Sequence, residues 1–92
     1  MRTHHLKDPH SGMEVELIDH GATVTRILTP DRHGYLADVL LGCPEPDDYL
    51  RPHPHFNCLV GRYANRISRA RFRLDDVDYE LDANVPPHHL HG

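Results

Sequence analysis

Short stretches in which apolar and polar residues alternate recur along this chain, with turn-forming residues between them. Val15 and Leu17 alternate with glutamates, and Ala22–Leu28 and Tyr35–Leu41 extend the pattern with many β-branched residues. Alternation with period two is typical of a strand with one buried face. No window has the 3.6-residue period of an amphipathic helix. The sequence therefore predicts an all-β chain of antiparallel strands joined by loops.

Further segments fit this organisation. Ala70–Leu74 and Val77–Leu81 alternate around Asp75-Asp76, which predicts a hairpin with the two aspartates in its turn. Residues 43–56 hold four of the eight prolines, so we expect no regular element there beyond a single turn near Asp47–Leu50.

The two ends and the middle of the chain are harder to assign. Residues 1–12 are polar, and we expect a frayed tail or the first edge of a sheet. Asn57–Val60 is expected as a short buried strand, and residues 84–92 as a loop rich in proline and histidine. Sheets of this kind usually close as a sandwich or barrel, and about six short strands would leave an unpaired edge. We therefore expect residues 13–92 to be part of a larger domain.

Charge and composition exclude some classes of partner. Ten Lys and Arg against fourteen Asp and Glu give a net charge of −4, whereas a phosphate-backbone binder needs a basic face. The first dozen residues contain no apolar signal-peptide core, and no apolar run approaches the roughly 20 residues of a membrane-spanning helix. With Cys43 and Cys58 expected as reduced thiols, we expect a cytoplasmic protein without nucleic-acid or membrane partners.

The strongest local motif is Gly61–Ile67, in which Asn65 and Arg66 are adjacent. An amide and a guanidinium side by side are well suited to binding hydroxyl and ring oxygens. The alternative is a basic loop whose arginines only balance the acidic turns; these are Arg62, Arg66, Arg69 and Arg71.

A second motif, His88–Gly92, is rich in imidazole, which binds sugars, exchanges protons near neutral pH or ligates metal. A zinc site needs three or four ligands at set geometry, and His53-x-His55 in a proline loop has no recognised spacing. We therefore expect no metal. The other histidines are expected as solvated loop residues (His53, His55, His88, His89) or tail residues (His4, His5, His10).

Four acidic residues lie around the predicted hairpin turn. Paired carboxylates across a sugar would suggest glycosidase chemistry, but these positions are in a turn and on an outward strand face. We expect solvated turn acids at Asp75, Asp76, Asp78 and Glu80.

Taken in order, these motifs resemble the aldose 1-epimerase family. The resemblance rests on NCLVGRYANRI at Asn57–Ile67, the hairpin RFRLDDVDYEL, and N-x-x-P-x-x-L-H-G at Asn84–Gly92; the upstream GATVTRILTPDRHGYLADVLLG and PDDYL are also similar to that family. It implies an N-terminal portion of a large antiparallel β-sandwich of galactose-mutarotase type. The implied function is interconversion of the α and β anomers of aldohexoses such as galactose and glucose, in carbohydrate metabolism, without cofactor or metal.

The resemblance also implies site residues. Asn65 and Arg66 match the family's sugar-binding pair, and His91 matches its sugar-contacting histidine. The family's acid His and base Glu match nothing in this chain and are expected downstream, so we expect an N-terminal fragment that is inactive alone. Two positions depart from the family: Asp76 stands where Gly is frequent, and His88 where Asn is usual.

Three alternatives stay open. One is a non-catalytic sugar-binding β module, and another is a His-rich metal-binding protein. The third is an epimerase acting on sugar phosphates, which would need extra basic residues near the site.

Overall fold

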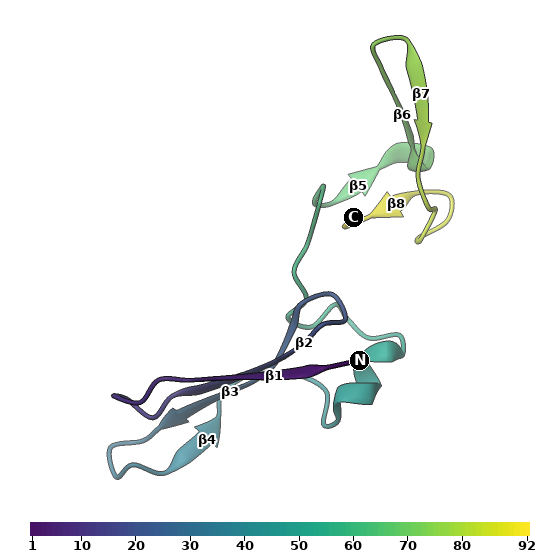
Figure 1. Ribbon diagram of the computed structural model, residues 1–92. Helices are drawn as coiled ribbons and strands as arrows, with labels where there is room; N and C mark the ends of the chain where they lie inside the picture. The colour runs from purple at the N-terminus through teal and green to yellow at the C-terminus, as the bar shows by residue number, and fades with distance from the viewer. The chain divides into compact units, whose positions relative to one another are not determined.

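Eight short strands and two 3₁₀ turns make up the structure, and no α-helix occurs, as the alternating pattern predicts. This computed structural model describes residues 1–92. Its internal contacts divide the chain into two units, Met1–Leu59 and Val60–Gly92, each of which is described by itself (Figure 1). No helix in either unit has the length and apolar character needed to cross a bilayer.

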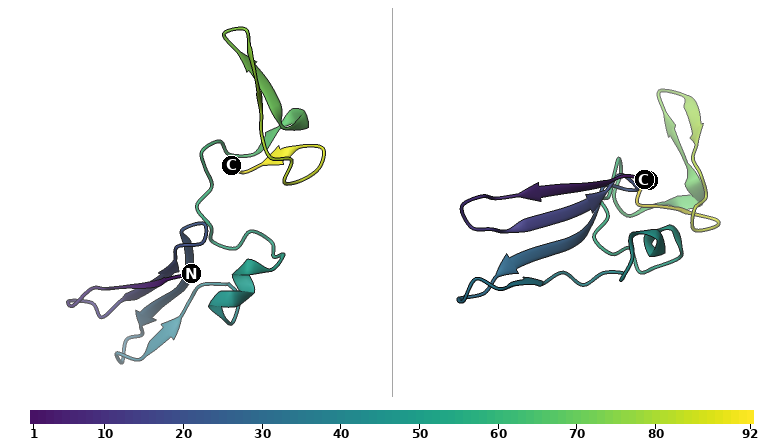
Figure 2. Two further views of the ribbon diagram at one scale, coloured as in Figure 1. Left: turned by 45° about the vertical axis from the view of Figure 1, so that its right-hand side comes forward. Right: turned by 60° about the horizontal axis from the view of Figure 1, so that its bottom comes forward.

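The first unit is built on a four-stranded antiparallel sheet whose strands follow one another in sequence order (Figure 2). The strands are β1 (Thr3–Lys7), β2 (Glu14–Ile18), β3 (Thr23–Pro30) and β4 (Leu36–Asp38). The predicted strands at 22–28 and 35–41 correspond to β3 and to a shorter β4. Each strand pairs with its neighbour in sequence, so the sheet is a simple meander.

The N-terminal residues form the edge of this sheet, which is the second of the two alternatives for residues 1–12. His4 and His5 are therefore strand residues, not the tail residues that were expected. Their strand is polar and exposed along its length, and its backbone ladder to β2 holds it in place. Lys7 donates to Glu14 across the pair at 2.8 Å, and this ammonium lowers the pKa of the Glu14 carboxyl.

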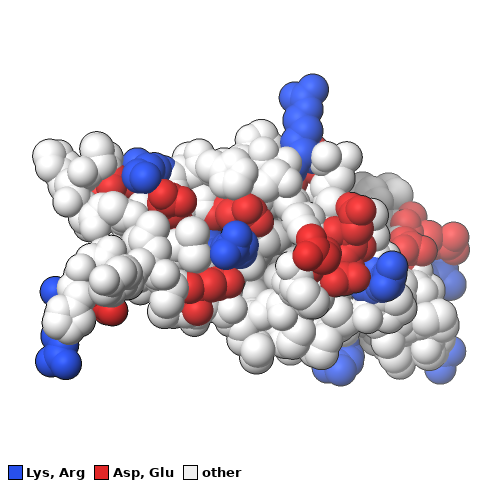
Figure 3. Space-filling model, turned by 90° about the horizontal axis from the view of Figure 1, so that it is seen from below, with Lys and Arg blue, Asp and Glu red and all other residues white.

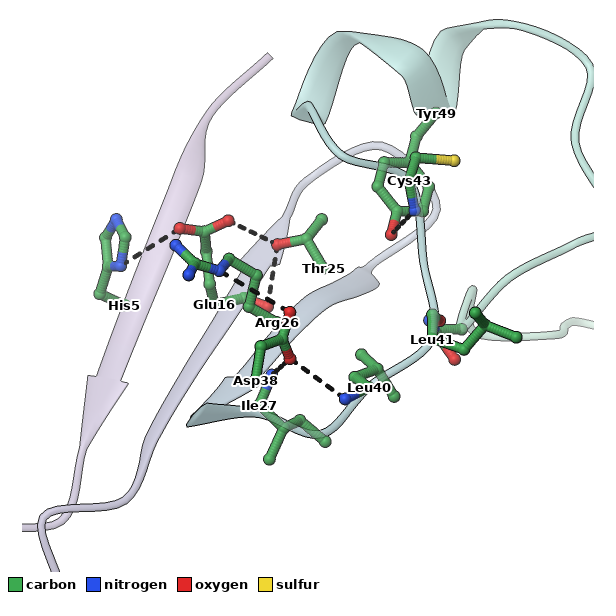
Figure 4. Close-up of polar contacts among 11 residues, drawn as sticks. His5, Glu16, Thr25, Arg26, Ile27, Asp38, Leu40, Leu41, Cys43 and Tyr49 are labelled. Atoms are coloured by element: carbon green, nitrogen blue, oxygen red, sulfur yellow. Dashed lines mark hydrogen bonds and ion pairs between the residues drawn. The ribbon is translucent and has the colours of Figure 1, made fainter. Parts of the chain in front are cut away.

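Several polar side chains of this sheet lie close together near a bulge between β2 and β3. The register shifts between Glu16 and Leu17, and the Thr25 hydroxyl donates to the Glu16 carboxylate at 2.7 Å (Figure 4). His5 lies 3.8 Å from the same carboxylate, and Arg26 lies 3.8 Å from Asp38. The charged groups on this face therefore partner one another.

The core of the first unit is small and centres on Ile18, Thr23 and Tyr49. Tyr49 lies on η1 (Pro46–Leu50), which confirms the single turn predicted near Asp47–Leu50. Its hydroxyl accepts a hydrogen bond from the Cys43 N–H at 3.0 Å. The ring thereby ties η1 to the segment that leaves β4.

The buried strand predicted at Asn57–Val60 is wrong. These residues form no strand, and Leu59 and Val60 are 75% and 40% exposed. The segment is attached to the sheet end by isolated backbone bonds, because Val24 donates to Asn57 and Leu59 donates to Gly21. An apolar pair therefore leads out of the first unit without entering a core.

The second unit contains a hairpin and a separate two-stranded sheet. The predicted hairpin is confirmed, with both turn aspartates at positive φ (48° and 62°), as in a type I′ turn. The loop expected at 84–92 is partly wrong, because its last residues pair with those after Asn65. The elements are β5 (Arg66–Ile67), η2 (Ser68–Ala70), β6 (Arg71–Leu74), β7 (Val77–Glu80) and β8 (His89–Leu90).

Charged side chains of both signs occur on the face shown in Figure 3, with acidic groups beside basic ones. Three of the ion pairs join residues close in sequence: Arg51 with Asp48, and Arg73 with Asp76 and with Asp78. The four acidic residues at the hairpin are exposed, as expected for solvated turn acids.

Candidate functional site

The pairing of β5 with β8 joins the two sequence motifs that were singled out. Arg66 is opposite Leu90, and Ile67 is opposite His89, so the next pair outward is Asn65 with His91. All three residues predicted to bind substrate, Asn65, Arg66 and His91, therefore meet at one end of a two-stranded sheet.

Two hydrogen bonds join Asn65 and His91. The His91 N–H donates to the Asn65 carbonyl at 3.0 Å, and the Asn65 N–H donates to Nδ1 of the His91 ring at 3.0 Å. An Nδ1 that accepts a hydrogen bond carries no proton, so the neutral ring holds its proton on Nε2. Both residues have positive φ, 67° and 64°, a region in which asparagine and histidine are enriched. The backbone thus turns out of the strand pair at both residues.

Arg66 is exposed beside this pair, and its Nη1 donates to the Asn65 side-chain oxygen at 3.3 Å. The acidic residues of the hairpin that form ion pairs, Asp76 and Asp78, pair with Arg73 instead. None of the ion pairs in the structure involves the four arginines of the alternative interpretation, Arg62, Arg66, Arg69 and Arg71. A loop that only balances the acidic turns is therefore not what the structure shows.

Glycine brings the ends of the two motifs into contact. A Cβ on Gly92, which has φ of 80°, would collide with the backbone carbonyl of Gly61. Next to this contact lies a cavity of about 860 Å³ with a mostly apolar wall. Its lining is Gly61, Arg62, Tyr63, Arg66, Ile67, Phe72, Leu81, His89 and Gly92. Arg66 therefore lines a cavity whose wall also contains aromatic and aliphatic side chains.

Asn84 also belongs to the candidate site, and no role is predicted for it from the sequence. Its side-chain Nδ2 donates to the Leu90 carbonyl at 2.7 Å, and its Oδ1 accepts from the Leu90 N–H at 2.7 Å. A lone asparagine six residues before Leu90 carries no periodic signal. Its place in the N-x-x-P-x-x-L-H-G motif is the one sequence feature that could have indicated it.

The histidines expected to be solvated in this motif have structural partners. His89 is 7% exposed, and its Nδ1 lies 2.7 Å from the Asp82 carbonyl, to which only a protonated Nδ1 can donate. His88 is half-buried and accepts from the Arg69 N–H at 3.0 Å. The solvated interpretation of these two is wrong. No group of three or more His, Cys, Asp or Glu side chains in residues 1–92 is placed to hold a metal ion.

In the first unit, His53 also differs from expectation. It is half-buried, its ring stacks on Phe56 with centroids 6.2 Å apart, and its Nδ1 accepts from the Phe56 N–H at 3.2 Å. Tyr49 meets the same ring edge-on at 5.4 Å. His53 therefore packs within the proline loop, while His55 is exposed there.

Comparison with known proteins gives consistent matches over nearly the whole chain. A family model described as aldose 1-epimerase matches residues 2–92. Galactose mutarotase from Sus scrofa is 44% identical over 80 residues, which are 87% of this chain and 23% of that protein. Aldose 1-epimerase from Escherichia coli is 35% identical over 83 residues, which are 90% of this chain and 24% of that protein.

Solved structures agree. The GalM/aldose epimerase homologue from C. elegans matches with a TM-score of 0.74 and 28% identity, over 98% of this chain and 28% of that chain. Galactose 1-epimerase from Lactobacillus acidophilus matches with a TM-score of 0.67 at 22% identity, over 99% of this chain and 30% of that chain, which shows a shared fold. The chain spans about a quarter of the length of the curated relatives that it matches.

Proposed function

Because this chain belongs to the aldose 1-epimerase family, we propose that it supplies substrate-positioning residues for interconversion of the α and β anomers of aldohexoses such as galactose and glucose. The observation that carries the proposal is the join between β5 and β8, which holds Asn65 and Arg66 beside His91. These three residues are proposed to bind the sugar.

Their chemistry suits a sugar ring. A guanidinium offers several N–H donors in a fixed fork, and an amide offers both a donor and an acceptor, so together they match hydroxyl and ring oxygens. The cavity beside Arg66, at about 860 Å³, falls within the usual size range of small-molecule sites. Its apolar wall would face the C–H groups of the ring. Holding the sugar in one orientation lowers the barrier to reaction, because the reacting groups then meet in a productive geometry.

The proposed reaction is general acid–base catalysis on the hemiacetal. A carboxylate takes the proton of the C1 hydroxyl while a histidine protonates the ring oxygen, so the ring opens. Rotation about C1–C2 and reclosure give the other anomer. We assign none of the 92 residues to these two proton transfers, because none matches the family's acid or base. No cofactor or metal enters this scheme.

Galactose binding tests the positioning role. We expect the 92-residue chain to bind galactose saturably, as measured by NMR chemical-shift titration, and Arg66→Ala to weaken that binding. Arg73→Ala is the matched control, because Arg73 is an exposed arginine of the same unit whose partners are Asp76 and Asp78. Absence of saturable binding by the unmodified chain would contradict the proposal.

Polarimetry tests whether the 92-residue chain catalyses mutarotation by itself. With no acid–base pair assigned, the 92-residue chain should leave freshly dissolved α-glucose to mutarotate at its spontaneous rate. A faster rate that disappears in Arg66→Ala would show that the proton-transfer groups are present after all. Sugar binding with no added rate fits a positioning role and equally a non-catalytic sugar-binding module. The two are separated by joining residues 1–92 to a chain that carries the acid and base and measuring the mutarotation rate. A positioning role predicts a faster rate, and a non-catalytic module predicts none.

We also propose that the protein acts in the cytoplasm. Both cysteines, Cys43 and Cys58, are free thiols, which suits a reducing compartment. Cell fractionation with an antibody against the chain tests this location.

A further inference from the structure

We propose that Asn84 is a positioning residue for His91, acting through the backbone of Leu90; this inference rests on the proposed sugar-binding role of His91. Asn84 contacts neither Asn65 nor Arg66 by hydrogen bond. Both of its side-chain bonds go to the residue immediately before His91.

The strand pairing explains why Leu90 needs this partner. In an antiparallel pair, residues that exchange hydrogen bonds alternate with residues that do not. The Asn65–His91 pair is of the bonded kind, so the Arg66–Leu90 pair is not, and the N–H and carbonyl of Leu90 point away from β5. Asn84 takes both groups at 2.7 Å each, in the manner of a neighbouring strand.

The same segment supports β8 at a second point. The Asp82 backbone carbonyl accepts a hydrogen bond from Nδ1 of His89, which is buried. Asn84 therefore lies on the side of β8 opposite β5, and Asp82 contacts the same strand through its carbonyl. Leu90 is held from both sides, by β5 through its neighbours and by the Asn84 amide directly.

Fixing Leu90 determines where His91 can go. The strand ends at Leu90, and the positive φ of His91 turns the chain so that its ring returns to the Asn65 N–H. A Leu90 backbone free to rotate would let the His91 ring leave Asn65. Asn84 is itself exposed, so its removal takes little packing from the unit. Its contribution is orientation of its neighbour.

The experiment compares the 92-residue chain with Asn84→Leu, which removes both bonds, and Asn84→Asp, which keeps an acceptor for the Leu90 N–H. Asp82→Ala is the control, because only its backbone carbonyl is used. Two measurements need no sugar: hydrogen exchange of the Leu90 amide, and the ¹⁵N shifts of the His91 ring, which report whether Nδ1 still accepts. The third is the dissociation constant for galactose.

For Asn84→Leu we expect faster Leu90 exchange, altered His91 ring shifts and galactose binding weakened on the order of tenfold, or ~1.4 kcal/mol. Asn84→Asp should fall between this variant and the unmodified chain, and exchange in the β6–β7 hairpin should stay unchanged in both. Unaltered His91 ring shifts in Asn84→Leu would overturn the proposal, whatever the affinity. Loss of hairpin protection in both variants would also overturn it, since Asn84 would then serve stability. If the ring shifts change while even the unmodified chain binds no galactose, Asn84 positions His91 and the proposed function fails.

Discussion

His91 and Asn65 form a strand-like hydrogen-bonded pair in which one of the two bonds uses an imidazole ring in place of a backbone carbonyl. The positive φ of His91 turns its own carbonyl out of the pair, and Nδ1 accepts the Asn65 N–H instead. His91, which is proposed to bind sugar, therefore also completes the hydrogen bonding at the end of the β5–β8 pair, beside Asn65 and Arg66.

Two substitutions at His91 separate the ring from the backbone. Both His91→Ala and His91→Gly remove the acceptor, so exchange of the Asn65 amide should accelerate by a factor corresponding to about 1 kcal/mol. His91→Ala should destabilise the β5–β8 pair further, because alanine tolerates φ of 64° less well than histidine or glycine. Hydrogen exchange followed by NMR measures both effects. Equal protection of the Asn65 amide in the unmodified chain and both variants would show that the ring bond contributes nothing.

Gly42 and Tyr49 are coupled through a close approach. A Cβ on Gly42 would collide with the Tyr49 hydroxyl, and Tyr49 is buried. Gly42→Ala should therefore destabilise the chain by about 1–3 kcal/mol, the usual cost of overpacking. In a Tyr49→Phe background the same change should cost less, because the colliding oxygen is gone. Urea unfolding of the four proteins in a double-mutant cycle measures the coupling, and strictly additive free energies would contradict it.

The stability of the turn between β1 and β2 should depend on pH, because the Asp8 carboxylate accepts hydrogen bonds within it. The Ser11 hydroxyl and the backbone N–H groups of His10 and Ser11 donate to its carboxylate and lower its pKa below the usual range. A carboxyl with a lowered folded-state pKa stabilises the turn above its unfolded pKa of about 3.9, and this stabilisation is lost as the pH falls through the folded value. The amide shifts of His10 and Ser11 should report this acid transition. Asp8→Asn, the control, should abolish it.

The hairpin turn offers a stabilising substitution. Asp75 and Asp76 both have positive φ, and an L-residue with a side chain is strained there. Asp76→Gly should stabilise the β6–β7 hairpin by about 1 kcal/mol. The ion pair that it removes involves an aspartate that is 98% exposed, so its loss should matter little. Protection of the hairpin amides is the measure, with Asp78→Gly as a control expected to destabilise, because Asp78 lies within β7.

The elements that the sequence predicts correctly are those encoded locally. The β6–β7 hairpin has alternation on both sides of a turn, and Phe72 and Tyr79 stack across it with centroids 5.0 Å apart. The β5–β8 pair has two residues per strand, and Pro86-Pro87 lies just before β8, so no local pattern marks it. Each of its strands pairs with a partner distant in sequence, and the outward groups of Leu90 are bonded to Asn84.

Two other differences have the same kind of cause. The polar strand β1 has no apolar face that would predict a strand. It forms because its backbone pairs with β2. Leu59 and Val60 are apolar and were therefore expected inside, but apolar character does not supply a neighbour to pack against. The proposed binding residues Asn65, Arg66 and His91 are indicated by the family resemblance. Their meeting depends on strand pairing that neither motif encodes alone.

The amide of Asn84 also affects how the second unit meets other chains. A strand at the edge of a sheet normally presents free N–H and carbonyl groups to which another chain can add as a further strand. At Leu90 both outward groups are already bonded to Asn84. A single side chain thus occupies both groups that a further strand would need at Leu90, next to the residue proposed to bind sugar.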